Sequence, residues 1–271
     1  MIPRAYITAW RQNAPWLQPS QVEQDLIICR ALVGMFKLPL LAENLAFRGG
    51  TALFKLHLPP VRYSEDIDLV QVKAGPIGPV LDALRESLDP WLGIPKRSRS
   101  EGRVTLVYRF DSEDGLPLRL KVEINSREHF THHGFERHPF AVESRWFSGK
   151  SEILTYSLDE LLGTKLRALY QRKKGRDLFD LWYAFIQGTP SPEAVRVVAS
   201  FLHYMEHGGH QISRALFEQN LLEKKADPQF TRDIEPLLTT DSNWDFDLAF
   251  DEVMDRLIAL LPGDPWQGRE Q

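Results

Sequence analysis

The sequence contains a single cysteine, Cys29, and no apolar run long enough to cross a membrane. One cysteine excludes an internal disulfide framework and a zinc site built from several thiolates. A bilayer-spanning helix needs about 20 consecutive apolar residues, and the best candidate run, Leu26–Cys29, ends at Arg30. The opening residues, MIPRAYITAWRQNAP, contain no apolar core of the kind found in signal peptides. We therefore expect a cytoplasmic protein with no membrane partner.

An excess of positive charge is also missing, because the 271 residues carry a formal net charge of −4. A chain of this charge is no general polycation, so binding to nucleic acid would need a local basic patch. Its 43% hydrophobic and 26% charged residues are typical of a folded globular protein. The length is sufficient for one large core or two modest ones.

Residue periodicity predicts a mixed amino-terminal domain and a helical carboxy-terminal domain. We assign the fold class α+β (mixed α/β), with a small mixed sheet flanked by helices in residues 1–150 and helices alone in residues 151–271. Capping boxes at Ser20 and Glu23, and at Ser157 and Glu160, are predicted to open two helices. The expected strands lie near residues 45–47, 67–70, 103–110 and 116–125, and the expected helices near 20–36, 51–58, 79–88, 157–171, 177–186, 192–206, 212–225 and 247–261.

The strongest chemical signal lies in the segment FRGGTALFKLHLPPVRYSEDIDLV. Side chains alternate between the two faces of a strand, so Asp66 and Asp68 project to the same side and both carboxylates can bind one hard cation. Gly49 and Gly50 follow a short strand and allow the backbone to approach a ligand closely. A helix that starts at this point favours a phosphate, and Thr51 adds a hydroxyl.

A third acid comes from the strand predicted at residues 116–125, whose apolar residues alternate with a polar face that carries Glu123. If that face adjoins the strand of Asp66 and Asp68, Glu123 completes a three-carboxylate site for Mg²⁺, with Mn²⁺ as the alternative. It would then deprotonate or orient the attacking hydroxyl. If the face is turned to solvent, Glu123 pairs only with Lys121 or Arg119, which contributes under about 1 kcal/mol. The local pattern leaves both arrangements open.

Each part of this pattern has an ordinary structural explanation. An isolated Asp-x-Asp is often a solvated strand edge, and an isolated glycine pair is often a turn. Ser64, two residues before Asp66, can approach a phosphate, but a turn hydroxyl is its ordinary role. The ordered combination of glycines, a hydroxyl, paired acids and a later strand acid is far more specific. Phosphoryl-transfer sites commonly use a metal held by carboxylates and substrate phosphates.

This combination resembles the DNA polymerase beta-type nucleotidyltransferase superfamily. More closely, the segments GGTAL, RYSEDIDL, KVEIN and KLRALYQRKKGRDLFDL resemble the AbiEii-type nucleotidyltransferase toxins of type IV toxin–antitoxin and abortive-infection systems. The resemblance extends from about Phe47 to Ala184. It implies a nucleotidyltransferase fold for residues 1–150 and transfer of a nucleoside monophosphate from an NTP to an RNA acceptor. It further implies tRNA modification at the 3′ end, a block in translation and a cognate antitoxin protein.

The segment KLRALYQRKKGR, from Lys165 to Arg176, contains six basic residues and no acid. Arg172, Lys173 and Lys174 are expected either at a solvated helix end or in loose contact with an RNA backbone. Lys165 lies in mid-helix among leucines. The resemblance implies that Lys165 joins the active site and neutralises charge on the triphosphate.

Arg176, Asp177 and Asp180 match the RDxxD motif of the AbiEii-type toxins. One of these acids could orient Lys165 or the acceptor hydroxyl, with Asp180 preferred to Asp177 for direct catalysis. A helix cap and a salt bridge explain either acid equally well. The helical domain is thereby expected to contribute Lys165 and the RDxxD motif to the cleft. The resulting nucleotide-binding set is Gly49, Gly50, Thr51, Ser64, Lys165 and Arg176.

Four histidines, His129, His132, His133 and His138, cluster in REHFTHHGFERHPF. Their spacing fits no zinc signature, and a loop that faces RNA is favoured over a metal site. Two other functional classes stay open: a nucleotidyltransferase that acts on a protein or small molecule, and an inactive RNA-binding or antitoxin-like module. Retention of the three acids argues against the inactive module.

Overall fold

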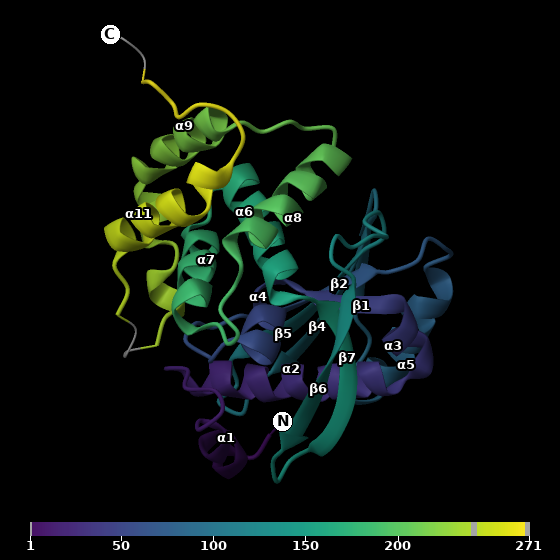
Figure 1. Ribbon diagram of the computed structural model, residues 1–271. Helices are drawn as coiled ribbons and strands as arrows, with labels where there is room; N and C mark the ends of the chain where they lie inside the picture. Colours follow the sequence, from purple (N-terminus) through teal and green to yellow (C-terminus); the bar gives the residue numbers. More distant parts are fainter. Residues whose placement is uncertain (1, 240–242, 269–271) are drawn as a thin grey trace. The chain divides into compact units, whose positions relative to one another are not determined.

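The computed structural model describes residues 2–239 and 243–268, and the chain separates into two compact units (Figure 1). The first unit is Met1–Tyr156 and the second is Ser157–Gln271. The division lies after Tyr156 rather than at the predicted residue 150, because strand β7 (Ser148–Tyr156) belongs to the sheet of the first unit. The polar first half of this strand has no hydrophobic run that would have marked it in the sequence.

A seven-stranded mixed sheet forms the centre of the first unit, with strand order β3-β4-β5-β2-β1-β7-β6. The β2–β5 and β1–β7 pairs are parallel, and the other neighbouring strands are antiparallel. The predicted fold class, a mixed sheet flanked by helices, is confirmed. The other strands are β1 (Leu45–Arg48), β2 (Asp66–Gln71), β3 (Lys96–Ser100), β4 (Arg103–Asp111), β5 (Pro117–Asn125) and β6 (Phe135–Glu143).

Helices cover one face of this sheet, where α2, α3 and α5 contact its strands. Alternate residues of β4 and β5, such as Leu106 and Val122, are buried, whereas the polar residues between them are half-buried or exposed. The strands thus have an apolar, helix-covered face and a polar face. The helices of this unit are α1 (Arg4–Trp10), α2 (Pro19–Lys37), α3 (Pro39–Asn44), α4 (Gly49–Ala52), a π-helix (Leu53–His57) and α5 (Gly78–Leu92).

Helix α2 begins one residue before the predicted cap, and the predicted capping box is wrong. Pro19 occupies the first helical position, which suits its fixed φ. The capping box is therefore formed by Gln18 and Gln21, and Ser20 is buried within the first turn. Glu23 instead accepts hydrogen bonds from the backbone N–H groups of other segments.

Three strands were not predicted from the sequence, and each is polar over much of its length. Strand β3, with the sequence KRSRS, is exposed at every residue and lies at the sheet edge. Strand β6 lies at the opposite edge and buries only Val142 fully. Edge strands need few apolar residues, so they lack the alternation by which strands are recognised.

The second unit is helical, as predicted. Its first helix, α6 (Leu158–Gln171), is capped by Ser157, whose hydroxyl accepts from the Glu160 backbone N–H at 3.3 Å. The other helices are α7 (Gly175–Gln187), α8 (Ala194–His207), α9 (Arg214–Lys225), α10 (Pro228–Arg232) and α11 (Phe246–Arg256), with 3₁₀ turns at Glu235–Leu237 and Ile258–Leu260. Across the described ranges, no helix combines the length and apolar character needed to span a bilayer.

A buried lysine, Lys224, caps the carboxy-terminal end of α6. Lys224 Nζ donates to the backbone carbonyls of Leu169 and Tyr170, the latter at 2.7 Å. These carbonyls have no partner further along the helix, and a cation suits the negative end of the helix dipole. Burial lowers the pKa of Lys224 to about 8. The capping interaction therefore ties α9 to α6.

Candidate active site

Three carboxylates meet on the polar face of the central strands. Strands β2 and β5 pair in parallel, with Asp68 opposite Glu123 and Asp66 opposite Lys121. Asp66 and Asp68 are both half-buried, and the residue between them, Ile67, is fully buried. The strand alternation predicted from the sequence therefore holds, and it places the two aspartates on the same face as Glu123.

The sequence left open which strand lies beside the polar face that carries Glu123. In the structure this neighbour is β2, the strand of Asp66 and Asp68. The Glu123 side chain is 17% exposed. Its carboxylate also forms ion pairs, with Lys121 Nζ at 3.0 Å and Arg103 Nε at 3.1 Å. Glu123 thus adjoins the aspartates and also pairs with Lys121. Its role as a metal ligand and base remains a prediction.

Arg48, which the sequence reasoning missed, lies on the other side of Asp68. Strands β1 and β2 pair antiparallel with Arg48 opposite Asp68, and Arg48 Nη1 is 2.5 Å from Glu128 Oε2. The available signal was its position directly before the glycine pair. Because the register of β1 against β2 is a tertiary property, this position alone could not show that Arg48 faces an acid.

Electrostatic repulsion within the acidic group is only partly offset. Burial raises the pKa of Asp68, the positive charge of Arg48 opposes the rise, and the negative charges of Asp66 and Glu123 add to it. Burial also raises the pKa of Asp66, against the lowering effect of Lys121. The ionised carboxylates are therefore less favourable here than in water, which is the condition under which a bound cation stabilises them.

Other side chains lie close to both glycines of the pair. Gly49 has φ +83°, and a Cβ at this position would lie 2.3 Å from Asp68 Oδ2. A Cβ on Gly50 would lie 2.4 Å from Arg62 Nη2. Arg62, another residue that the sequence reasoning missed, is 3% exposed. The glycine pair therefore lets the backbone pass directly beside an acid and a buried guanidinium group.

The hydroxyl groups predicted to contact a nucleotide are engaged within the protein. Thr51 is buried and donates from Oγ1 to the Asp66 carbonyl at 2.5 Å. Its oxygen also lies 2.9 Å from Ser64 Oγ. Since the Thr51 proton is used by Asp66, the hydroxyl fixes the start of β2 against α4. Contact of Gly49, Gly50, Thr51 or Ser64 with a nucleotide remains a prediction.

The chemistry of the donor set fits a divalent metal ion. Three carboxylates on one face offer the oxygen ligands that Mg²⁺ prefers, and their repulsion is incompletely neutralised. Within residues 2–239 and 243–268, however, no group of three acidic, histidine or cysteine side chains already has the arrangement of a metal site. The Lys121 ammonium group contacts Asp66 Oδ2 at 3.4 Å as well as Glu123. Metal binding at these acids would compete with Lys121 for the same oxygens.

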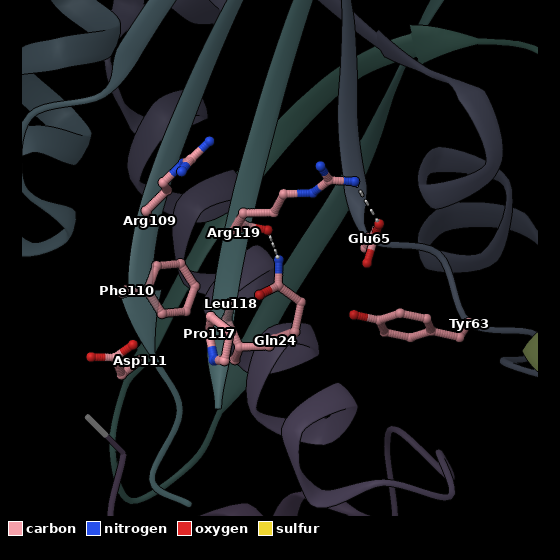
Figure 2. A pocket seen from close by; sticks show the side chains of 9 residues that line it. All are labelled: Gln24, Tyr63, Glu65, Arg109, Phe110, Asp111, Pro117, Leu118 and Arg119. Atoms are coloured by element: carbon pink, nitrogen blue, oxygen red, sulfur yellow. Dashed lines mark hydrogen bonds and ion pairs between the residues drawn. The ribbon is translucent and has the colours of Figure 1, made fainter. Parts of the chain in front are cut away.

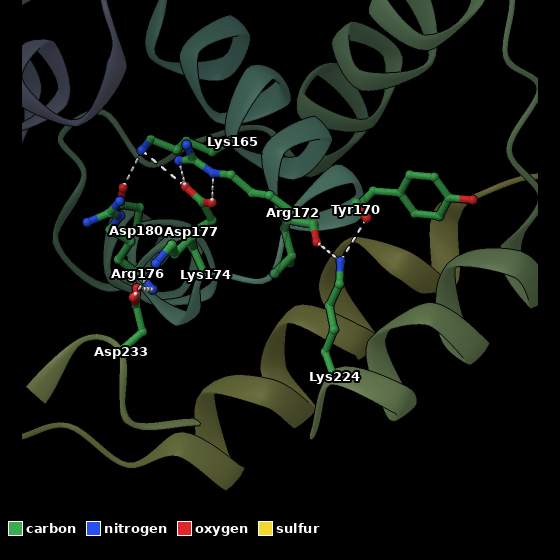
Figure 3. A network of polar contacts seen from close by, with 10 residues as sticks. Lys165, Tyr170, Arg172, Lys174, Arg176, Asp177, Asp180, Lys224 and Asp233 are labelled. Carbon is green, nitrogen blue, oxygen red and sulfur yellow. Dashed lines mark hydrogen bonds and ion pairs between the residues drawn. The ribbon is translucent and has the colours of Figure 1, made fainter. Parts of the chain in front are cut away.

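The residues predicted in the second unit form a buried ion-pair network (Figure 3). Lys165 Nζ lies 2.7 Å from Asp180 Oδ2 and 3.4 Å from Asp177 Oδ1. Both aspartates are fully buried, and Lys165 is 7% exposed. Lys174, rather than Asp177, is the residue that precedes the first turn of α7. The acids of the RDxxD motif therefore do form salt bridges. A catalytic role for Lys165, Asp177 or Asp180 remains a prediction.

The three cations predicted to bind RNA are also ion-paired. Arg172 binds Asp177 with two nitrogens, Nε to Oδ2 at 2.7 Å and Nη2 to Oδ1 at 2.8 Å. Lys173 pairs with Asp227 at 2.9 Å and Lys174 with Asp233 at 3.3 Å. The Arg176 backbone N–H also donates to Asp233, at 3.3 Å. Sequence spacing could not show these partners, since two of them come from α10 or its flanks.

The histidines of this segment contact other parts of the first unit as well as each other. His129 Nδ1 lies 2.7 Å from the Gln71 carbonyl oxygen, and the rings of His132 and His133 are 4.4 Å apart. His138 lies on β6, where its ring is 4.6 Å from that of His57. Burial lowers the pKa of His57 to about 4. These contacts give the segment a structural explanation, and RNA contact stays a prediction.

The sheet and the position of its acids define a class of protein. A glycine pair after β1, two acids on β2 and a third on the adjacent β5 are the arrangement of a nucleotidyltransferase fold. MenT4, a nucleotidyltransferase toxin from Mycobacterium tuberculosis, has a similar structure, with a TM-score of 0.67 and 17% identity over 97% of this chain and 91% of that chain. JHP933 from Helicobacter pylori has a TM-score of 0.55 and 15% identity over 89% and 91%. At these identities the similarity shows the fold.

The sequence profile of the AbiEii nucleotidyltransferase toxins of type IV toxin–antitoxin systems matches residues 30–252. The chain therefore belongs to this family, as its resemblance predicted. No curated protein matched the sequence. Family membership establishes a toxin-class nucleotidyltransferase that uses an NTP and has a cognate antitoxin.

Proposed function

We propose that the chain transfers a nucleoside monophosphate from an NTP to the 3′ end of a tRNA, in a reaction that requires Mg²⁺. One observation carries the proposal: the register of β2 and β5 places Asp68 opposite Glu123, with Asp66 on the same face. When bound, Mg²⁺ would neutralise phosphate charge and lower the pKa of the attacking hydroxyl. Asp66, Asp68 and Glu123 are the residues that would hold it.

The neighbouring side chains suit this chemistry. Gly49 leaves space directly beside Asp68, because any Cβ there would overlap with its carboxylate. Arg48 and Lys121 add positive charge next to the acids, and positive groups stabilise the charge that develops on a transferring phosphoryl group. Glu123 would accept or orient the proton of the acceptor hydroxyl.

A labelling experiment tests the proposal directly. The purified chain is incubated with MgCl₂, total tRNA and each of the four NTPs labelled at the α-phosphate, and we expect label from at least one NTP to become attached to tRNA. tRNA whose 3′-terminal diol has been oxidised with periodate is the matched acceptor control and should remain unlabelled. If the label is found on protein or on a small molecule instead, that molecule, and not RNA, is the acceptor. Absence of label on any acceptor would overturn the assignment.

Transfer to the tRNA 3′ end would also explain how the toxin arrests growth. A tRNA blocked at its 3′ end cannot be aminoacylated, so translation stops and growth is arrested, which is an outcome suited to abortive infection. NTPs and tRNA are both cytoplasmic, and we propose that location for the toxin. Expression from an inducible promoter should arrest growth, and the antitoxin should restore it. Continued growth with full accumulation of the active chain would contradict this setting.

A further inference from the structure

Two arginines face each other on the polar face of β4 and β5. Arg109 is directly opposite Arg119, and both side chains are exposed. Arg119 Nη2 lies 3.6 Å from Glu65 Oε1, whereas Arg109 forms no ion pair with any residue that the structure describes. Like charges directly opposite each other destabilise a sheet. A bound anion would relieve this repulsion.

The arginine pair lines an open groove of about 630 Å³ (Figure 2). Figure 2 shows Arg119 extending from β5 toward Glu65, with Arg109 on the neighbouring strand. Tyr63 and Phe110 also line the groove, but Tyr63 is only 8% exposed and Phe110 alternates with Arg109 along β4, so it belongs to the other face of the strand. Exposed guanidinium groups are the groups with which proteins bind nucleic-acid phosphates. The arginine pair therefore has the charge that a phosphate contact needs.

The polar face continues from the acids to the edge of the sheet. Lys96 on β3 is opposite Val107, Val107 is opposite Lys121, and Lys121 is opposite Asp66. Residues opposite each other share a face, so Lys96 lies on the face of the carboxylates. It is three strands away from Asp66, a distance of about 14 Å at the usual strand spacing. Lys96 is exposed and, across the described ranges, has no ion-pair partner.

The opposite face of β4 and β5 is closed. Leu106 and Tyr108 are fully buried there, and the Tyr108 hydroxyl donates to Asp89 of α5 at 2.9 Å. A polynucleotide can therefore follow the sheet to the carboxylates only along the polar face. Arg97 and Arg99 alternate with Lys96 on β3 and belong to the face of Leu106.

We propose that the acceptor RNA lies across the polar face of β5, β4 and β3, with its phosphates bound by Arg109 and Lys96. This inference rests on the proposed function and adds the surface that the acceptor occupies. The net charge of −4 means that RNA needs a local cationic path. Lys173 and Lys174 already pair with aspartates, whereas Lys96 and Arg109 have charges available for phosphate. Paired cations have less to gain from RNA because an ion pair must first be broken.

The experiment compares three charge-matched double variants of the full chain in tRNA binding without NTP. Fluorescence anisotropy is recorded over a series of KCl concentrations. The test variant is Lys96→Gln/Arg109→Gln. Arg97→Gln/Arg99→Gln is the control, because these arginines lie on the same strand as Lys96 but on its opposite face. Lys173→Gln/Lys174→Gln tests the turn between α6 and α7. All six side chains are exposed, so the three variants should remain folded, with thermal midpoints within a few degrees of the wild type.

We expect the slope of log affinity against log salt to become shallower by about 1.4 units in Lys96→Gln/Arg109→Gln, since each single-strand phosphate contact accounts for about 0.7. The Arg97→Gln/Arg99→Gln variant should keep the wild-type slope. An equal change in these two variants would overturn the assignment to one face. A change confined to Lys173→Gln/Lys174→Gln, or an unchanged slope in all three, would overturn the proposed surface altogether.

Two further measurements separate this inference from its alternatives. With labelled NTP, Lys96→Gln/Arg109→Gln should raise the KM for tRNA and leave kcat unchanged, which is the signature of lost binding rather than lost chemistry. If no transfer to RNA occurs with the wild type, the proposed function fails, whereas the salt series still tests the surface. Unchanged tRNA binding together with loss of neutralisation by the antitoxin would assign the surface to protein docking and overturn the RNA proposal.

Discussion

The two units each contain a cluster of charged side chains, and the clusters are built in opposite ways. In the first unit, three carboxylates share a half-buried sheet face. Burial raises the pKa values of Asp66 and Asp68, and the negative charges of Asp66 and Glu123 raise that of Asp68 further. In the second, Lys165 lies against two fully buried aspartates, one of which is also held by Arg172. Cations only partly offset the repulsion in the first cluster, whereas in the second the cations lie directly against both acids.

This difference separates a group of acids that an added cation would stabilise from a network that already contains its own cations. The repulsion that remains among the carboxylates costs stability, which an added cation can recover. A matched buried network gains nothing from an added cation, and removal of one partner leaves an uncompensated charge. Lys165 therefore has a structural role in addition to any that it plays on the triphosphate.

The largest expected effect is the loss of activity when the acidic cluster is neutralised. Asp66→Asn/Asp68→Asn should lower transfer by at least about a thousandfold, because a bound metal contributes several kcal/mol of transition-state stabilisation. The labelled-NTP assay measures this loss, and circular dichroism should show an intact fold. Full activity in a folded double variant would remove the cluster from the active site.

The second expected effect is a loss of stability when the matched network is broken. Lys165→Ala removes the cation from two buried aspartates and should lower the free energy of unfolding by about 3–5 kcal/mol, as measured by urea denaturation. A wild-type stability would contradict the structural role.

Replacement of both partners by apolar residues is the control for this network. Lys165→Met/Asp180→Leu should recover most of the stability, because a buried ion pair can be exchanged for apolar packing. If Lys165 also acts on the triphosphate, this stable variant will still have a low kcat with unchanged tRNA affinity. Recovery of kcat together with stability would make the role of Lys165 purely structural.

A smaller effect is expected from a single methyl group beside the acids. Gly49→Ala and Gly115→Ala both place a side chain at positive φ, which costs about 1–2 kcal/mol. Only the Gly49 methyl would meet Asp68, whereas Gly115 has no atom within 4 Å of the added Cβ. Both variants should be destabilised, but only Gly49→Ala should lose transfer activity. Equal activity in the two variants would show that the position of Asp68 is unimportant.

The smallest expected effect concerns pH. Because the pKa of Asp68 is higher in the folded chain than its ordinary value, its ionisation disfavours folding as pH rises through the carboxyl range. Asp68→Asn should therefore raise Tm at pH 7.5 by a few degrees, since each kcal/mol of added folding stability raises Tm by about 2–4 °C. The gain should shrink as pH falls below the folded-state pKa.

Asp82→Asn, on the exposed side of α5, is the matched control for this shift and should leave Tm unchanged. Addition of MgCl₂ should stabilise the wild type more than Asp68→Asn, because the metal relieves the same repulsion. A lower Tm for Asp68→Asn at every pH would contradict the repulsion argument.

The sequence predicted those features of the fold and the site that depend on local periodicity. Alternation in DIDL placed Asp66 and Asp68 on one face, and alternation in β5 placed Glu123 on a polar face. The same criterion missed β3, because an exposed edge strand buries no alternate residues. Periodicity reports burial, so it detects the strands at the centre of the sheet more readily than those at its edges.

Features that depend on which segments become neighbours could not be predicted. The pairing of β2 with β5, and of Arg48 with Asp68, follows from the register of strands distant in sequence. Arg172 was expected at a solvated helix end or in loose contact with RNA, and it does lie at the exposed end of α6. Its partner Asp177, which the turn between α6 and α7 brings to the guanidinium group, was not predicted. Local reasoning therefore identified the charged residues correctly and left most of their partners undetermined.

The strand order also controls when during synthesis the acidic cluster can form. The central strands β1 and β2 are made early, but their outer neighbours, β7 and β5, come much later in the chain. A ribosome adds about 5–20 residues each second, so for several seconds the nascent chain has Asp66 and Asp68 but lacks the strand that carries Glu123. Premature termination before β5 releases a fragment without this strand. Fragments of the toxin should therefore be harmless to the cell that makes them.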